Sequence, residues 1–126
     1  MSDNITFATL NVRGAIKKDV ARAKILSGIQ LYKINVLLLQ ETHVNNLKLK
    51  NEVDKFFNCK SFWSFGSNDS KGSAILILNN FHHEIIKFDH DDDGRIVKVE
   101  LKTSLGNVNI ISLYAPNDIS ERKFFF

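Results

Sequence analysis

The chain has few of the residues that cross-link a fold through disulfides or interrupt its helices and strands. Its 126 residues include one cysteine, Cys59, one proline and one tryptophan. A single cysteine cannot form an intramolecular disulfide, so nothing indicates a disulfide-stapled secreted scaffold, and we expect Cys59 to be a small, semi-buried residue. No apolar run approaches the roughly 18 residues that cross a bilayer, and no signal-peptide pattern is found. We therefore expect a nuclear or cytoplasmic location and no membrane partner.

The composition is that of an ordinary globular protein. The hydrophobic fraction is 44% and the charged fraction 25%, values typical of folded soluble domains. The length suits one domain. We find no internal repeat and no low-complexity linker, so we predict a single domain over residues 1–126.

Positive charge is concentrated in the first half of the chain. Residues 1–60 carry ten Lys and Arg against five Asp and Glu, whereas residues 61–126 carry seven against nine. This asymmetry permits a polyanionic partner such as DNA without requiring one. Two alternatives stay open for Lys17, Lys18, Arg22 and Lys24: contact with a DNA backbone, or a solvated helix face, which is the more common role.

Strands and helices alternate in the first half. Residues 5–12 alternate as a strand and end before Gly14, while the apolar run at 34–40 predicts an inner strand covered on both faces. Apolar residues at three- and four-residue steps predict an amphipathic helix from 16 to 32 and a second from 46 to 57. The expected buried residues are Ile16, Val20, Ala23, Leu26 and Ile29 in the first helix, and Leu49, Val53, Phe56 and Phe57 in the second.

The second half consists of short β-rich runs. Gly, Asn, Asp and Ser separate these runs, as is typical of an antiparallel meander, with turns at 89–94 and 104–107. After Pro116, residues 117–126 resemble the start of a helix capped by Asn117 or Asp118. Its three phenylalanines suggest a domain that continues beyond this point.

Polar residues stand at the ends of three predicted strands. Asn11 stands at the end of the first strand, Glu41 follows the inner strand, and Tyr114 and Asn117 flank the end of the last strand. A carboxylate is a hard oxygen ligand for Mg²⁺, and amide and phenol groups can hold phosphate oxygens. Such a group suits phosphodiester hydrolysis. The alternative is that these are solvated strand ends, which are polar in most proteins.

Five ordered motifs at these positions resemble a known superfamily. They are "TLNVRG" (9–14), "VLLLQETH" (36–43), "KGSAILI" (71–77), "DGRIVKVEL" (93–101) and "ISLYAPND" (111–118). Their order and spacing are similar to those of the endonuclease/exonuclease/phosphatase superfamily. They resemble most closely the apurinic-endonuclease-like domain of non-LTR (LINE-type) retrotransposon polyproteins, which carry a reverse transcriptase.

The resemblance implies a DNase I-like four-layer α/β sandwich and magnesium-dependent cleavage of a DNA strand that leaves a 3′-hydroxyl to prime reverse transcription. It assigns active-site orientation to Asn11, Mg²⁺ coordination to Glu41 and a phosphate or transition-state contact to Tyr114. Arg13 and Asn117 are implied as secondary DNA contacts. All five are the candidate site residues.

The chain departs from the family by ending early. The family continues with an Asp-x-Asn motif, a further Asp and a Ser-Asp-His motif whose histidine helps to activate water. We therefore expect the N-terminal half of such a fold, with no assignable general base, little or no nicking activity alone, and self-association or association with the missing half. The alternatives are another phosphoesterase of the superfamily, such as an exonuclease or phosphatase, and a catalytically inactive binding or assembly module.

Three other motifs have ordinary interpretations. His82 and His83 point to opposite faces of a strand and cannot readily chelate one ion. The acidic turn at 89–94 resembles a calcium loop in composition, but strand-like alternation follows it. Core packing is the favoured role for Trp63, Phe62 and Phe65, with base stacking as the alternative.

Overall fold

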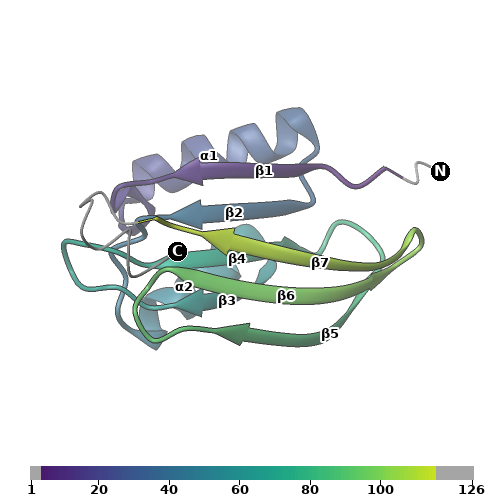
Figure 1. Ribbon diagram of the computed structural model, residues 1–126. Coiled ribbons are helices and arrows are strands. Elements are labelled where there is room, and N and C mark those ends of the chain that lie inside the picture. The colour runs from purple at the N-terminus through teal and green to yellow at the C-terminus, as the bar shows by residue number, and fades with distance from the viewer. Residues whose placement is uncertain (1–3, 116–126) are drawn as a thin grey trace.

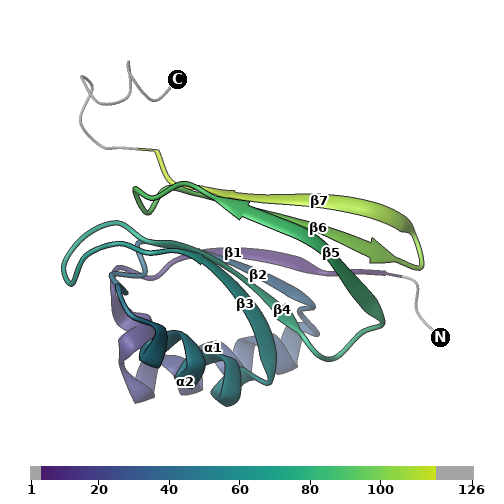
Figure 2. The same cartoon turned by 90° about the horizontal axis from the view of Figure 1, so that it is seen from below.

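The computed structural model describes residues 4–115 as three stacked layers (Figures 1 and 2). Two helices cover the outer face of a four-stranded sheet, and a three-stranded sheet packs on its other face. The first sheet and its helices comprise β1 (Phe7–Asn11), a 3-10 turn η1 (Ala15–Lys17), α1 (Asp19–Tyr32), β2 (Val36–Gln40), α2 (Leu47–Phe57), β3 (Cys59–Ser64) and β4 (Ser73–Leu78). The second sheet comprises β5 (His83–His90), β6 (Ile96–Thr103) and β7 (Gly106–Leu113).

The first sheet has the strand order β1-β2-β4-β3. The β1-α1-β2 unit makes β1 and β2 parallel, and the register pairs Asn11 with Gln40. The C-terminal ends of both strands therefore lie side by side, which brings the residues that follow them together. β2 lies between β1 and β4, as its uninterrupted apolar sequence predicted.

The second sheet is the antiparallel meander that the β-rich second half predicted, in the order β5-β6-β7. The first two β-rich runs, however, form β3 and β4 of the first sheet, where β4 pairs with β2 and β3 pairs with β4. Local turn signals do not reveal this division, because which sheet a strand joins depends on long-range packing. A core of branched aliphatic side chains joins the sheets: Val36, Ile75, Ile77, Val97, Val99, Leu101 and Ile110.

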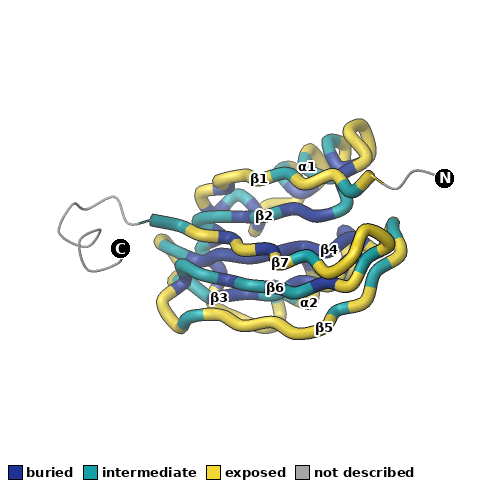
Figure 3. Tube along the Cα trace, turned by 45° about the vertical axis from the view of Figure 1, so that its right-hand side comes forward, coloured by how far each residue is buried: buried dark blue, intermediate teal, exposed yellow. Residues whose placement is uncertain are grey.

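A second core lies between the first sheet and the helices. It includes Leu37, Leu39 and Leu76 from the strands and Ile29 and Val53 from the helices. Residues 4–115 thus form three of the four predicted layers. Within residues 4–115 no helix covers the outer face of the second sheet, where Ile111 is 56% exposed and Leu113 44%. Figure 3 shows that β5 is exposed over most of its length.

The predicted buried face of the first helix is partly wrong. Val20 and Ala23 are exposed, whereas Arg22 is buried at 6% exposure. The extended backbone of Lys18 separates Ile16 from α1, so the helical repeat begins again at Asp19 and turns Arg22 inward. Arg22 Nε donates to the carbonyl of Ile16 at 2.6 Å. Arg22 therefore packs in the fold and is not part of a basic surface.

Two further expectations concern single residues. Phe56, predicted to be buried, is 39% exposed, while its neighbour Phe57 packs in the core. Cys59 is buried and unpaired, as expected, and its burial, together with the nearby Asp54 carboxylate, raises the pKa of its thiol. The helix expected after Pro116 lies outside the described residues. Among residues 4–115, no helix is long and apolar enough to cross a membrane.

Candidate active site

Asn11 and Glu41 contact each other at the common end of β1 and β2. The Asn11 side-chain amide Nδ2 donates a hydrogen bond to Glu41 Oε2. The backbone supports this pair, because Val12 N donates to Gln40 O at 3.0 Å and Gly14 N donates to Glu41 O at 2.8 Å. The parallel register thus brings together two predicted site residues that are 30 positions apart.

Glu41 begins a strained loop between β2 and α2, residues 41–46, which we call the Glu41 loop. Glu41 has φ 53° and His43 has φ 55°, in the left-handed region that side chains other than glycine adopt rarely. Between them Thr42 is fully buried, and its N–H donates to Gly72 O at 3.0 Å. His43 N donates to Lys71 O at 2.9 Å. Inward anchoring of Thr42 leaves the Glu41 and His43 side chains on the same side, 20% and 15% exposed.

Glycine is required beside this loop. A Cβ at Gly72, where φ is +98°, would lie 2.1 Å from Thr42 Oγ1 and 3.2 Å from His43 N. Real Cβ atoms do not approach other atoms so closely, and a side chain is strained at this φ. Gly72 therefore allows the chain at the start of β4 to pack closely against the Glu41 loop.

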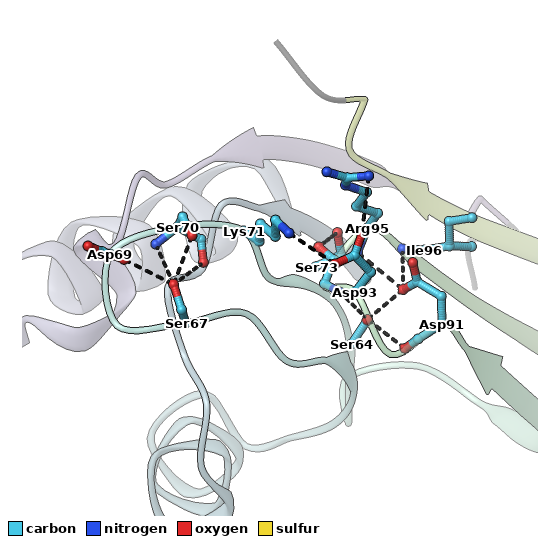
Figure 4. A network of polar contacts seen from close by, with 11 residues as sticks. Ser64, Ser67, Asp69, Ser70, Lys71, Ser73, Asp91, Asp93, Arg95 and Ile96 are labelled. Atoms are coloured by element: carbon cyan, nitrogen blue, oxygen red, sulfur yellow. Dashed lines mark hydrogen bonds and ion pairs between the residues drawn. The ribbon is translucent and has the colours of Figure 1, made fainter. Parts of the chain in front are cut away.

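Main-chain hydrogen bonds through Gly72 join the Glu41 loop to the acidic turn between β5 and β6. Gly72 N donates to Gly94 O at 2.9 Å. Within the turn, the Asp91 carboxylate accepts from the Ser64 hydroxyl at 2.6 Å and from Ile96 N at 3.0 Å (Figure 4). Partial burial alone would raise the pKa of Asp91, but these hydrogen bonds outweigh it and hold that pKa below its ordinary value. The turn links the two sheets, which is its role in place of a calcium loop.

Tyr114 lies at the other side of the same strand ends. Its backbone N–H donates to Arg95 O at 2.9 Å. Tyr114 and Asn11 line one cavity of about 430 Å³ between the two sheets. The structure thus brings Asn11 into contact with Glu41 and places Asn11 and Tyr114 on one cavity.

A row of hydrogen-bonded side chains in this cavity was missed by the sequence reasoning. Gln40 Nε2 donates to Thr9 Oγ1 at 3.0 Å and to Ser112 Oγ at 3.3 Å, and Ser112 Oγ donates to Leu39 O at 3.3 Å. The row fixes the approach of β7 to β2. The available signal was Gln40 itself, a polar residue on an inner strand that must find partners.

The remaining predicted site residues are less well placed. Arg13 is exposed, with φ 45°, and its backbone N–H donates to Asn11 Oδ1 at 3.3 Å, which helps to orient the amide. Asn117 lies outside the described residues. The basic group Lys17, Lys18, Arg22 and Lys24 loses Arg22 to the core, and Lys17 Nζ donates to Asn68 O at 2.7 Å.

Other motifs have structural roles. Trp63 is buried and donates from Nε1 to Ser61 Oγ at 2.6 Å, as the core-packing interpretation predicted. His83 stacks on Phe81 and lies 2.9 Å from the Phe81 carbonyl, while His82 is exposed. These two histidines are therefore not arranged as a chelating pair.

The chemistry of the site suits a lightly held hard cation. Among residues 4–115, no three His, Cys, Asp or Glu side chains cluster closely enough to enclose a metal ion. Glu41 supplies one carboxylate with partial solvent access. Mg²⁺ is commonly bound by one or two carboxylates while it keeps several waters. The residues present therefore fit a hydrated Mg²⁺ held by Glu41, and they do not form a complete protein cage.

The stacked sheets with outer helices have the DNase I-like fold that the sequence resemblance implied. The chain aligns with an AP endonuclease from Archaeoglobus fulgidus with a TM-score of 0.67 and 22% identity, over 96% of this chain and 46% of that one. The endonuclease domain of TRAS1, a telomere-specific non-LTR retrotransposon, aligns with a TM-score of 0.63 and 17% identity, over 96% of this chain and 49% of that one. D. rerio TDP2 complexed with a single-strand DNA product aligns with a TM-score of 0.65 and 16% identity, over 96% of this chain and 51% of that one.

One curated relative is a transposon protein. The chain is 28% identical over 129 aligned residues to the "Transposon TX1 uncharacterized 149 kDa protein" of Xenopus laevis. The alignment covers 97% of this chain and 9% of that protein. No protein-family model matches the chain. The chain thus spans about half the length of the aligned structures and less than a tenth of the transposon protein.

Proposed function

We propose that the chain is an N-terminal portion of a magnesium-dependent DNA endonuclease domain of the retrotransposon type. The observation that carries the proposal is the Asn11–Glu41 hydrogen bond at the end of β1 and β2, beside the cavity that Asn11 shares with Tyr114. The similarity to a transposon protein and to a retrotransposon endonuclease domain supports this choice within the superfamily.

The proposed roles follow from the contacts of each side chain. Asn11 orients the Glu41 carboxylate through its amide, and Glu41 holds Mg²⁺ with its remaining lone pairs. A Mg²⁺ ion held there would supply neutralisation of the phosphate charge and activation of water. Tyr114 contacts the phosphate from the cavity wall, and Arg13 contacts DNA nearby. The role proposed for Asn117, which lies outside the described residues, is a further DNA contact. Arg13 suits phosphate because its guanidinium can bind two oxygens at once.

We propose that the activity of this chain alone is low. The resemblance places the water-activating histidine and its acidic partner in a segment that the chain does not contain. Losing part of a catalytic unit typically costs several powers of ten in rate. A well-placed Glu41 does not compensate for that loss.

A plasmid-nicking assay tests both statements. We expect weak nicking of supercoiled DNA in Mg²⁺, abolished by EDTA and by Glu41→Ala, and no hydrolysis of p-nitrophenyl phosphate. Hydrolysis of that small phosphoester without nicking would favour a phosphatase instead. Robust nicking that disappears in Glu41→Ala would support the site but contradict low activity.

The exposed strand edges favour a protein partner. In the described part of the chain, β1 pairs only with β2 and β7 only with β6. Between these edges, two cavities of about 380 and 430 Å³ share Thr9, Leu38 and Ile111 and form one groove, the edge groove. Unpaired edges beside apolar surface recruit further strands.

We propose that the chain on its own self-associates through the edge groove, with a second copy taking the place of the segment that completes the aligned structures. Sedimentation equilibrium over a range of concentrations tests this. A mass that rises above that of one chain is the expected result. A monodisperse monomer at all concentrations would contradict self-association while leaving the endonuclease proposal intact.

A further inference from the structure

His43 lies beside the proposed metal ligand, and the proposed catalytic roles do not use it. Its Nε2 is 4.0 Å from Glu41 Oε1, the carboxylate oxygen that Asn11 does not contact. The Asn11 amide therefore lies next to one oxygen of the Glu41 carboxylate, and the His43 imidazole lies next to the other.

The imidazole is held in place by the backbone around it. Its Nδ1 would lie 2.7 Å from a Cβ at residue 14, so the ring packs directly over Gly14. Gly14 N in turn donates to Glu41 O, and His43 N donates to Lys71 O. The ring, the C-terminal end of β1 and the Glu41 loop thus pack against one another. Residue 14 must lack a side chain for this packing.

One ring atom is left without a partner. Within the described residues, His43 Nε2 is buried and makes no hydrogen bond. Buried polar atoms nearly always have a partner, and an exception calls for a functional or structural reason. A movement of about 1 Å by either side chain brings Nε2 and Glu41 Oε1 to the 2.7–3.2 Å of an ordinary N–H···O hydrogen bond. No other atom is required to explain the position of Nε2.

We propose that His43 is a positioning residue for Glu41, donating from Nε2–H to Oε1 so that the carboxylate presents its other lone pairs to a divalent cation. An ionised carboxylate has about four acceptor positions. Asn11 uses one on Oε2 and His43 uses one on Oε1, which leaves one on each oxygen. This inference rests on the proposed role of Glu41 as a metal ligand, and it adds a residue that sets the orientation of that ligand.

Two substitutions separate donation from packing. His43→Gln keeps an N–H donor at about the distance of Nε2, whereas His43→Leu keeps a similar volume and removes the donor. Both are placed at φ 55°, so they bear comparable backbone strain. Glu41→Gln is the third variant, and it removes the carboxylate charge.

The first readout is binding of Mn²⁺ alone, measured from the electron paramagnetic resonance signal of free Mn²⁺. We expect His43→Leu to weaken binding about 10-fold or more, the usual effect of removing a group that orients a metal ligand. His43→Gln should restore most of the affinity, and Glu41→Gln should abolish binding. The role of His43 would be overturned if His43→Leu bound Mn²⁺ as tightly as the unmodified chain. It would also be overturned if His43→Leu and His43→Gln lost the same amount of Mn²⁺ affinity. Unchanged binding in Glu41→Gln would overturn the metal site itself.

The second readout needs no metal. A double-mutant cycle combines Glu41→Gln with His43→Leu and measures unfolding by urea in EDTA. Donation predicts a favourable coupling between residues 41 and 43. Additive effects would overturn the proposed hydrogen bond whatever the metal measurements give, so the inference and the proposed function fail separately.

Discussion

Gly72 and Gly94 lie backbone to backbone where the two sheets meet. Gly72 N donates to Gly94 O at 2.9 Å, and a Cβ at Gly94 would lie 2.7 Å from Gly72 N. Gly72 O in turn accepts from Thr42 N. The acidic turn, the start of β4 and the Glu41 loop are therefore connected by main-chain contacts that only glycine permits.

Gly72→Ala should destabilise the protein by about 2–4 kcal/mol, because it combines a positive φ with a close contact. The Cβ would meet Thr42 Oγ1 at 2.1 Å. Urea unfolding followed by circular dichroism measures the change. Gly28→Ala is the matched control, since Gly28 lies within α1 and a Cβ there would meet no atom within 4 Å. Alanine is preferred there by about 0.5–1 kcal/mol, so the control should be more stable than the parent chain. Equal effects of both substitutions would contradict the close packing at Gly72.

Asp91→Ala should destabilise the fold in a pH-dependent way. The Asp91 carboxylate accepts hydrogen bonds from Ser64 and from backbone N–H groups, and its pKa is lowered in the folded state. A lowered folded pKa contributes stability above the unfolded value of about 4, and this contribution is lost as the pH falls through the folded pKa. We expect a loss of about 1–3 kcal/mol at pH 7 that shrinks in more acidic solution.

Asp92→Ala is the control for Asp91. The Asp92 side chain is fully exposed, so its removal should leave the free energy of unfolding nearly unchanged. Urea unfolding at pH 7 and at lower pH compares the two variants. A constant difference between Asp91→Ala and the parent chain at all pH values would contradict the pKa argument.

Asn11→Asp should place a second carboxylate against Glu41. Two like charges in contact repel each other, so we expect a loss of stability of about 1–3 kcal/mol at pH 8. Addition of Mg²⁺ should recover part of this loss if the ion binds between the carboxylates. Thermal unfolding with and without Mg²⁺ measures both effects.

Asn107→Asp provides the comparison, because Asn107 is exposed and pairs with Lys102 on the neighbouring strand. Opposite charges across strands are mildly favourable. Its stability should be unchanged or slightly higher, and it should not respond to Mg²⁺. A similar response in the two variants would show that the effect at Asn11 comes from net charge and not from Glu41.

Phe7→Lys should prevent the proposed self-association. Phe7 is 46% exposed on edge strand β1 and lines the edge groove. A lysine on an edge strand discourages pairing with another chain. Sedimentation equilibrium should show a shift toward monomer. Val20→Lys is the control, since Val20 is 71% exposed on α1, away from the groove, and should leave association unchanged.

The candidate site shows which features local sequence can predict. Asn11 and Glu41 were chosen because each ends a predicted strand, and the parallel register then placed them in contact. The apolar run before Glu41 was correctly predicted to be an inner strand. Arg22 was placed on the wrong face, because the extended residue Lys18 interrupts the helical repeat. The spacing of apolar residues alone does not predict where the backbone leaves the helical conformation.

The order and type of the β1, α1, β2 and α2 segments follow from the sequence itself, since hydrophobic periodicity and capping act over a few residues. The residue types at the strand ends likewise define the chemistry that the chain can offer. Only the tertiary structure decided that β3 and β4 join the first sheet, that the acidic turn binds Ser64, and that His43 faces Glu41. These relationships join residues from separate elements, and packing and hydrogen-bond satisfaction across the whole fold select them.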